Sequence, residues 1–457
     1  MKKDDIIEVK IESTGMDGEG VARLDNFVIF INGALLGEEL KAQVTEVKKS
    51  FARAKIIKVL KPSQFRQQPL CPIFYRCGGC DMQHVNYKYS LSVKKANVKN
   101  CIEKELGREV EVNDVIYGEK LFGYRNKEQI PIRKVDGKAR AGFYKQGSHI
   151  FVPFEKSVDA SYGDCPLHDS SMQLFIDAIV DFINKEKIST YDEKTNTGII
   201  RHIVIRRVDK TFSICLVING NSIPNEKKLI QVLKNVNIPF NLFLSENKRI
   251  TNVILGDKLT CIYGDDRIEG NALDIRFKVN PYSFLQVNDE IRDKIYSYIQ
   301  KLVSENKGAT VIDAYSGIGI LSNILAKYAK KVVGIEIVPE AIKDANELAK
   351  TNGNSNIVNI CGDAAIELPK VVNDIDENNT ILVLDPPRKG CDDRVLTSIC
   401  MARPNKIIYI SCNPATLARD LKKLDSVYNI KSITPYDMFP QTKHVETVCL
   451  LTLKNQK

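Results

Sequence analysis

The segment Thr310–Glu336 constrains the fold of this chain more than any other stretch. It begins with an apolar strand that runs into the turn Gly317-Ile-Gly319, and a helix to about residue 330 follows. A second apolar strand, Lys331–Glu336, ends on an acid about twenty residues after the glycines, a spacing typical of nucleotide-binding units. The glycines let the backbone approach a ligand, and the carboxylate accepts hydrogen bonds from ribose hydroxyls. The segment predicts a site for an adenosine-type ligand, although a Gly-x-Gly turn alone is a weak signal.

The rest of the C-terminal third continues the alternation of strand and helix. A third short strand precedes Cys361-Gly-Asp363, where the carboxylate could meet an adenine ring. Further strands are expected at residues 380–384, 406–411, about 430–435 and 448–453. Strands that alternate with helices in this way predict an α/β fold with a doubly wound, mainly parallel sheet.

One of these strands ends at a cysteine. The apolar stretch Lys406–Ser411 stops at Cys412, and Pro414 opens a helix two residues later. Open α/β sheets bind ligands at the carboxyl ends of their strands, so this thiol is placed as a nucleophile. A lone cysteine after a strand is more often buried and inert. The polar segments Leu384–Gly390 and Thr442–Thr447 in the same third of the chain favour the functional interpretation.

Four of the twelve cysteines form a second pattern. Cys71, Cys77 and Cys80 lie in a loop punctuated by Gly and Pro, and Cys165 precedes a proline much further along. Three close thiols and one distant thiol are typical of zinc or an iron–sulfur cluster. Because only one close pair is present rather than two matched knuckles, the spacing favours an iron–sulfur cluster, with zinc as the main rival. A disulfide framework is not expected in a cytosolic chain.

The positive charge is concentrated in two places. The chain carries a formal net charge of +9, and residues 41–66 hold eight Lys or Arg against the single acid Glu46. Residues 124–145 hold seven basic residues interleaved with aromatic ones. Such clusters neutralise phosphates and stack bases, although each alone is equally consistent with a solvated strand face. Two clusters in one chain favour an RNA or DNA partner.

The chain is too long for one ordinary domain. Residues 1–61 alternate apolar and polar positions between turn signals, which predicts a small OB-like β-barrel. Residues 62–275 are expected to form a mixed α+β unit that contains the cysteine loop, and residues 276–457 the doubly wound unit. The N-terminus has no apolar signal segment and no run is long enough to span a membrane, so we expect a cytoplasmic protein.

Four motifs together identify a resemblance. They are Asn280-Pro-Tyr-Ser-Phe-Leu-Gln-Val-Asn288, Asp385-Pro-Pro-Arg-Lys-Gly390, Ser411-Cys-Asn-Pro414 and His444-Val-Glu446. With them the chain resembles, over essentially its whole length, the bacterial RNA uracil-5-methyltransferases that use S-adenosylmethionine. It is most similar to the 23S ribosomal RNA branch, which has an N-terminal TRAM barrel and a [4Fe–4S] cluster.

The resemblance implies a role for each matching position. Cys412 would be the nucleophile and Glu446 the base. The cofactor-binding positions would be Gln286, Tyr315, Glu336, Asp385 and, with less support, Asp363 and Ser316. The cluster ligands would be Cys71, Cys77, Cys80 and Cys165. It further implies a Rossmann-like class I methyltransferase domain against which a helix at about 86–116 packs, 23S ribosomal RNA as the partner, and a monomer without an obligate protein partner.

This chemistry needs these residue types. Carbon 5 of uracil is a poor nucleophile until a thiolate adds to carbon 6, and a base must then remove the carbon 5 proton. An ordinary thiol has a pKa of about 8.5, so the site is expected to favour the anion. Arg388 is a candidate for that role or for binding the target phosphate.

Other activities fit the motifs less well. A cytosine-5 methyltransferase would carry its cysteine in another motif, and an adenine N-methyltransferase would have an aromatic residue where Arg388 stands. A radical enzyme would need a Cys-x3-Cys-x2-Cys loop. A tRNA uracil-5-methyltransferase and a non-catalytic iron–sulfur RNA-binding protein remain alternatives.

Overall fold

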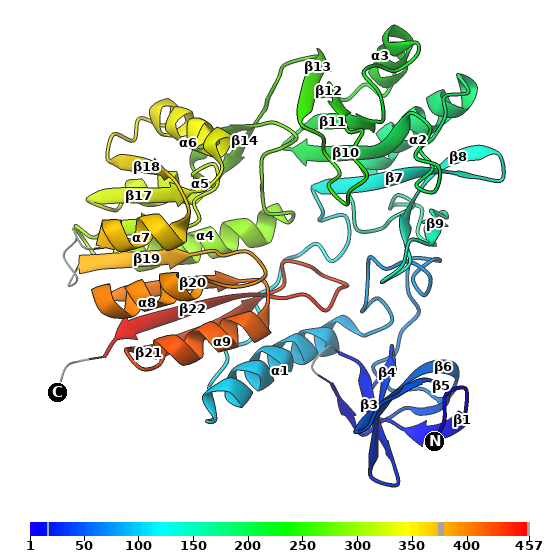
Figure 1. Ribbon diagram of the computed structural model, residues 1–457, viewed down its shortest axis with the longest axis horizontal. Helices are drawn as coiled ribbons and strands as arrows, with labels where there is room; N and C mark the ends of the chain where they lie inside the picture. Colours follow the sequence, from blue (N-terminus) through cyan, green and yellow to red (C-terminus); the bar gives the residue numbers. More distant parts are fainter. Residues whose placement is uncertain (16–17, 373–378, 455–457) are drawn as a thin grey trace.

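The computed structural model describes residues 1–15, 18–372 and 379–454, and these residues form three large β-sheets and one two-stranded sheet (Figure 1). The first lies at the N-terminus and has the strand order β1-β5-β6-β4-β3-β2. Its strands are β1 (Ile6–Lys10), β2 (Ser13–Thr14), β3 (Gly20–Leu24), β4 (Phe27–Asn32), β5 (Glu39–Val47) and β6 (Phe51–Lys61). Alternate apolar residues of these strands form a small core, and the pairing of β5 with β6 shifts register three times. Such bulges bend a strand, so this sheet is curved.

A long helix links the N-terminal sheet to the C-terminal part of the chain. Residues 62–86 contain no helix or paired strand, and α1 (Tyr87–Leu106) follows them. The side chain of Asn86 caps its first turn, and Gly107 ends it in the left-handed conformation with a φ of 68°. Figure 1 shows α1 along α9 (Pro414–Leu424), against which it packs.

The second sheet has seven strands in the order β13-β12-β11-β10-β7-β8-β9. Its strands are β7 (Lys127–Val135), β8 (Lys138–Tyr144), β9 (Phe151–Pro153), β10 (Ile200–Val208), β11 (Thr211–Ile218), β12 (Phe240–Glu246) and β13 (Lys258–Tyr263). Helices α2 (Ser170–Lys185) and α3 (Glu226–Lys234) share the largest apolar cluster of the chain with these strands. This part is therefore a mixed α+β unit.

The third sheet carries the C-terminal alternation, after the hairpin β14 (Ile268–Ala272) and β15 (Ile275–Val279). Its order is β18-β17-β16-β19-β20-β22-β21; the pairs from β18 to β20 are parallel, and β22 runs antiparallel to both of its neighbours, β20 and β21. The strands are β16 (Thr310–Asp313), β17 (Lys331–Glu336), β18 (Ile357–Cys361), β19 (Thr380–Leu384), β20 (Lys406–Ser411), β21 (Tyr428–Tyr436) and β22 (Glu446–Leu453). The doubly wound, mainly parallel sheet expected from the sequence is confirmed.

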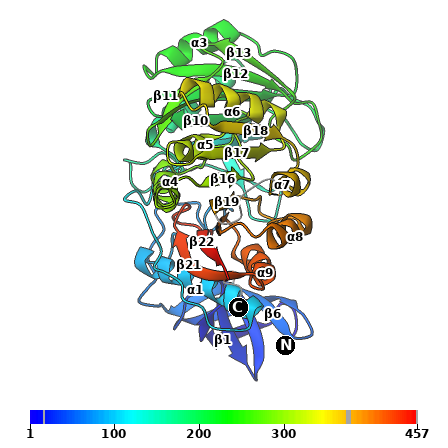
Figure 2. The same ribbon diagram turned by 90° about the vertical axis from the view of Figure 1, so that its left-hand side faces the viewer.

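Helices cover both faces of this sheet. They are α4 (Asp289–Ser304), α5 (Ile320–Ala326), α6 (Pro339–Thr351), α7 (Ala364–Val372), α8 (Asp393–Ala402) and α9. Figure 2 shows α4 and α5 on one side and α7, α8 and α9 on the other, and two separate apolar clusters fill the two interfaces. None of the helices in the described part of the chain combines the length and apolar character needed to cross a bilayer.

Candidate active site and cysteine cavity

A cavity of about 690 Å³ opens at the carboxyl ends of the parallel strands. Each strand from β16 to β20 ends in a residue or short loop that lines it, and β22 begins in its wall. The site residues expected from the sequence that line this cavity are Gln286, Tyr315, Glu336, Asp363, Asp385, Arg388, Cys412 and Glu446. Ser316 does not line it, because its hydroxyl is buried beside Gly334 under the turn. The topology therefore brings together groups that lie up to 160 positions apart.

The glycine turn and Glu336 hold each other in place. Gly317 and Gly319 have φ angles of 55° and 80°, a conformation that side chains rarely adopt. The carboxylate of Glu336 accepts a hydrogen bond from the backbone N–H of Gly317 at 3.0 Å and another from Val338 at 2.9 Å. Each carboxylate oxygen keeps lone pairs for a ligand, so Glu336 can shape the turn and bind ribose hydroxyls together.

Asp363 also has a structural role. Its carboxylate accepts from the backbone N–H of Ala365 at 2.9 Å, next to the start of α7. A carboxylate that is held at a helix start remains able to accept one more hydrogen bond from a ligand. Asp363 lines the same cavity as Glu336, so the geometry is compatible with the adenine contact expected from the sequence.

The nucleophile candidate lies among buried acids. Cys412 is half-buried, and burial together with the nearby Glu446 raises its pKa to about 11, although the charge of Arg388 opposes the shift. Burial and the charge of Asp313 raise the pKa of Asp385 to about 7. Glu446 is only 3% exposed, and burial and Asp385 raise its pKa well above the usual range. The expectation that the site by itself favours the thiolate is therefore wrong, because burial outweighs Arg388.

The central sheet positions the Asn280–Asn288 segment. The side-chain amide of Asn126 donates to the carbonyl of Gln286 at 3.0 Å, and Arg206 donates to the carbonyl of Ser283 at 2.6 Å. Neither Asn126 nor Arg206 was anticipated as a site residue, because no local motif marks them. Both are buried polar residues on or beside strands of another sheet, which is the only signal the sequence offers.

Phe284 is a further residue that sequence reasoning did not assign a role. It lies within the same segment and lines the cavity, yet its side chain is 70% exposed. A large aromatic residue exposed at the rim of a cavity offers a stacking surface to a nucleobase.

The segment between β21 and β22 contacts α1 and the cysteine loop, two parts of the chain that are distant from it in sequence. Asp437 pairs with Lys94 of α1, with Nζ and Oδ1 2.5 Å apart, and both side chains are almost fully buried. The carbonyl of Gln441 accepts backbone N–H groups of Asp81 at 3.2 Å and Met82 at 3.0 Å. Gln441 itself has a φ of 67°. Glu446 therefore follows a segment that α1 and the cysteine loop hold from both sides.

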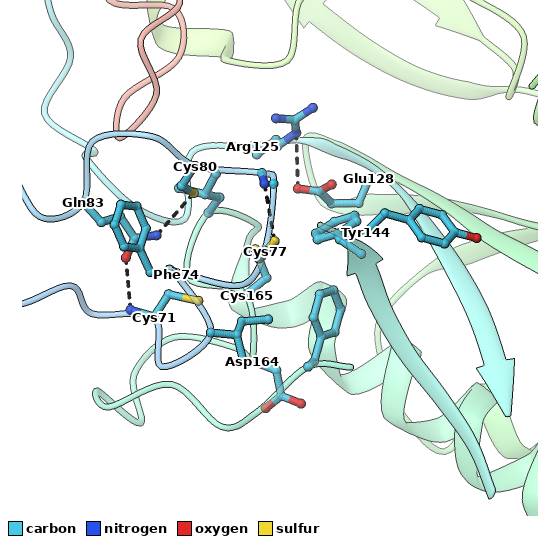
Figure 3. Close-up of a pocket in the computed structure, with 16 residues that line it drawn as sticks. Cys71, Phe74, Cys77, Cys80, Gln83, Arg125, Glu128, Tyr144, Asp164 and Cys165 are labelled. Atoms are coloured by element: carbon cyan, nitrogen blue, oxygen red, sulfur yellow. Dashed lines mark hydrogen bonds and ion pairs between the residues drawn. The ribbon is translucent and has the colours of Figure 1, made fainter. Parts of the chain in front are cut away.

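The four cysteines expected to bind a cluster line one cavity of about 250 Å³ (Figure 3). Burial raises the pKa of all four thiols, that of Cys71 to about 11. Backbone and side-chain amides already point at two sulfurs: Gly79 N–H at Cys77 (3.4 Å) and the Gln83 amide at Cys80 (3.2 Å). Arg125 and Glu128 form a buried ion pair of 3.2 Å in the same wall. In the described residues no three His, Cys, Asp or Glu side chains gather around a point where one metal ion could sit.

Comparison with known proteins gives consistent matches. Residues 225–454 match the tRNA (uracil-5-)-methyltransferase family and residues 4–57 match the TRAM domain. A protein of Clostridium acetobutylicum named as an uncharacterized RNA methyltransferase is 38% identical, with 99% of this chain and 98% of that protein covered. A protein of the same description from Halalkalibacterium halodurans is 37% identical, with 100% and 98% covered.

A solved structure resembles the chain over nearly its whole length. The tRNA (uracil-54, C5)-methyltransferase of Pyrococcus abyssi, in complex with S-adenosyl-L-homocysteine, superposes with a TM-score of 0.74 at 26% identity. The alignment covers 98% of this chain and 100% of that one.

Proposed function

Because the chain belongs to the tRNA (uracil-5-)-methyltransferase family and is an S-adenosylmethionine-dependent RNA uracil-5-methyltransferase, we propose that it methylates carbon 5 of a specific uridine in 23S ribosomal RNA. The observation that carries the proposal is that Cys412 and Glu446 line the same cavity as the glycine turn and Glu336. A nucleophile, a base and a nucleoside site in one cavity are what this reaction needs.

Cys412 begins the proposed reaction. Its thiolate adds to carbon 6 of the uracil ring, which opens the double bond between carbons 5 and 6 and places the negative charge on the ring as an enolate. S-adenosylmethionine supplies an electrophilic methyl group on a positively charged sulfonium when it is bound. Carbon 5 would take up that methyl group while the bond from the methyl to the sulfonium sulfur breaks and leaves its electron pair on the sulfur, which becomes a neutral thioether. The positive charge of the bound sulfonium would also lower the pKa of the Cys412 thiol, adding to the effect of Arg388.

Glu446 completes the proposed reaction. As a carboxylate it accepts the proton of carbon 5, the electron pair of that bond restores the double bond, and the bond from carbon 6 to the Cys412 sulfur breaks. A base with a raised pKa is well matched to this proton, and burial gives Glu446 that property. The cavity residues Gln286, Tyr315, Glu336, Asp363 and Asp385 would hold the cofactor.

We also propose that Cys71, Cys77, Cys80 and Cys165 bind a [4Fe–4S] cluster. A tetrahedral ion binds sulfur at about 2.3 Å and would draw the donors into one compact group, whereas each iron of a cluster takes its own thiolate. The shared cavity and the two amide groups that point at sulfur support the cluster. Four thiolates leave no open iron, so its proposed role is structural. Anaerobically purified protein should contain about four irons, and stoichiometric zinc without iron would contradict the assignment.

Three consecutive parts of the chain are proposed to have three different functions. Residues 1–61, as an OB-like TRAM barrel, bind RNA; residues 62–275 hold the cluster; and residues 276–457, with α1 against them, carry out catalysis. The guanidinium of Arg53 in the first unit lies over the adjacent rings of Phe30 and Phe51, 5.9 Å and 5.8 Å from their centroids, a surface suited to phosphate and base contacts. The enzyme is proposed to act as a cytoplasmic monomer on ribosomal RNA.

A tRNA uridine is the second candidate substrate, favoured by the whole-length similarity to the Pyrococcus abyssi enzyme. Incubation with unmodified 23S RNA and with tRNA transcripts, each with labelled S-adenosylmethionine, separates the two. Mapping of the label to a uridine of 23S RNA supports the proposal, and exclusive labelling of tRNA overturns the choice of substrate.

Two variants test the mechanism. Cys412→Ser should yield neither methylated RNA nor a covalent adduct, because the hydroxyl is too weakly acidic to add to carbon 6. Glu446→Gln should methylate but release slowly, so that a protein–RNA complex survives a denaturing gel. If Glu446→Gln turns over normally, another residue removes the carbon 5 proton.

A further inference from the structure

A second cavity, of about 210 Å³, opens beside the nucleophile. It shares Cys412 and Arg388 with the large cavity, and the rest of its wall comes from other elements. Asn97 of α1 lies on one side, Asn413 at the start of α9 on another, and Lys443 and His444 close it. A group that reacts at Cys412 therefore has the cofactor cavity on one side and this smaller cavity on the other.

The wall of the smaller cavity is positively charged. Arg388 and Lys443 take part in no ion pair with a carboxylate in the part of the chain that the structure describes, whereas Arg394 and Lys423 nearby in sequence are paired with acids. Arg388, Lys443 and His444 line the same cavity, and burial and the charges of Arg388, Lys443 and Lys94 lower the pKa of His444. Asp81 acts in the opposite direction on His444 and accepts from the backbone N–H of Lys443 at 3.5 Å.

The side-chain amide of Asn97 adds a hydrogen-bond donor to the wall of the smaller cavity. Asn97 is half-buried on α1, and its side-chain oxygen accepts from the thiol of Cys101 at 3.5 Å. That contact uses one of the two lone pairs of the amide oxygen and fixes this oxygen towards Cys101, and the amide nitrogen has two N–H donors. Two cations and an amide donor suit a ligand that presents an anion and carbonyl or ring-nitrogen acceptors.

We propose that this cavity receives the nucleotide next to the target uridine in the substrate RNA, with its phosphate against Arg388 and Lys443 and its base edge at Asn97. The inference rests on the proposed function. The strand must continue from a uridine whose carbon 6 meets Cys412, and the large cavity is already shared by the uracil ring and the cofactor. A phosphate prefers the fork of an arginine, and unstacked bases of single-stranded RNA are recognised through their edges.

Asn97 would then contribute to the choice of target site. It comes from a helix outside the sheet that carries the nucleophile, and the packing of α1 on α9 places it in the wall of the cavity that Cys412 also lines. Loss of a hydrogen bond to a base should change recognition of that neighbour without changing the chemistry at Cys412.

The test combines altered enzymes with altered RNA. The substrate is an RNA fragment shown to be methylated by the wild type, prepared also with an abasic site 5′ or 3′ of the target uridine. With wild-type enzyme, one of the two abasic RNAs should lower kcat/KM about tenfold, the effect of a lost base contact. With Asn97→Ala the same change should cost less than about twofold, because the contact is already absent. Asn100→Ala, an exposed asparagine on the same helix, should behave like wild type.

A second arm probes the phosphate and does not depend on the packing of α1. A methylphosphonate, which is neutral, replaces one phosphate next to the target, and Lys443→Ala is compared with wild type. The neutral linkage should raise KM for the wild type and have a smaller effect on Lys443→Ala, while kcat changes less than KM. If the protein change and the RNA change act independently in both arms, so that the RNA change has the same effect on kcat/KM or KM in the variant as in the wild type, the inference is overturned. Absence of methylation of any RNA by the wild type would instead refute the proposed function.

Discussion

The cofactor cavity and the cysteine cavity are built in opposite ways. In the first, five residues lie at or just after the carboxyl ends of parallel strands of one sheet, so backbone pairing positions them: Tyr315, Glu336, Asp363, Asp385 and Cys412. In the second, three of the four cysteines lie in residues 62–86, where the described backbone has turns and a single isolated bridge.

The difference concerns what holds each site when nothing is bound. A sheet keeps its strand ends in register without a ligand, whereas a loop is ordered only by its own contacts and by whatever its side chains bind. Burial raises the pKa of the loop thiols, and the contacts that the protein makes to Cys77 and Cys80 sulfur are one amide hydrogen bond each. The cysteine cavity should therefore depend on its bound group and the cofactor cavity should not.

The largest effect that tests this comparison is expected for Cys165→Ser. This change removes one proposed ligand, so the iron content should fall from about four to near zero and residues 62–86 should become sensitive to protease. Because the sheet holds the cofactor cavity, the affinity for S-adenosylmethionine should change by less than about threefold, half a kcal/mol or so. Iron analysis, limited proteolysis and calorimetry measure the three outcomes.

The control for Cys165→Ser is Cys261→Ser. Cys261 is a partly buried cysteine on β13 that does not line the cavity, so this variant should keep its iron. Full iron in Cys165→Ser would remove that residue from the ligand set. Loss of cofactor binding together with iron would show that the two regions are not independent.

A smaller effect, on the free energy of unfolding, is expected for the buried ion pair that joins α1 to the segment before Glu446. Lys94→Met leaves the carboxylate of Asp437 buried without its partner, and breaking such a pair costs about 3–5 kcal/mol. The neighbouring Lys95→Met removes only a pair with Asp114, whose side chain is 97% exposed and screened by water, so it should leave the free energy of unfolding nearly unchanged. Urea unfolding followed by circular dichroism compares the two variants. Equal costs would mean that the buried pair does not hold α1 to the segment before Glu446.

The cofactor cavity itself should be less stable at high pH. The pKa of Asp385 is raised to about 7, so the folded state holds this proton more tightly than the unfolded chain does. The resulting stabilisation is complete below about pH 4 and is lost as the pH rises through 7, up to about 4 kcal/mol. Asp385→Asn should therefore match wild type near pH 4 and be more stable at pH 8.5. Asp392→Asn, at an exposed helix cap, should show no such gain.

The sequence predicted the cofactor cavity better than its surroundings. Because residues at the carboxyl ends of parallel strands share one edge, the alternation of strand and helix was enough to place Cys412 near Glu336. The end of β20 at Ser411 agrees with the prediction. The packing of α1 on α9 brings Asn97 to Cys412 across more than 300 residues, and no local pattern encodes such a contact.

Electrostatics was the least predictable property. A cysteine beside an arginine indicates a stabilised thiolate, yet the pKa of Cys412 is raised, because burial and the charge of Glu446 together outweigh the charge of Arg388. Burial depends on the whole fold, so the residue types alone could not give the sign of this shift. The residue types alone also could not show that Asn126 and Arg206 position the Asn280–Asn288 segment from another sheet, because these contacts depend on the whole fold.

The smallest of these effects concerns Glu336, where the two functions of one carboxylate can be separated. Glu336→Ala removes the acceptor for a ribose hydroxyl and should weaken S-adenosylmethionine binding by about 1.5–3 kcal/mol, the range for hydrogen bonds to charged groups. It also removes the acceptor for the N–H groups of Gly317 and Val338, so part of the loss would come from a loosened turn. Glu336→Gln keeps one acceptor oxygen and should lose less affinity. Glu340→Ala, in the first turn of α6, should lose none. Calorimetry on the three variants orders them, and unchanged affinity in Glu336→Ala would show that the strand end shapes the cavity without touching the cofactor.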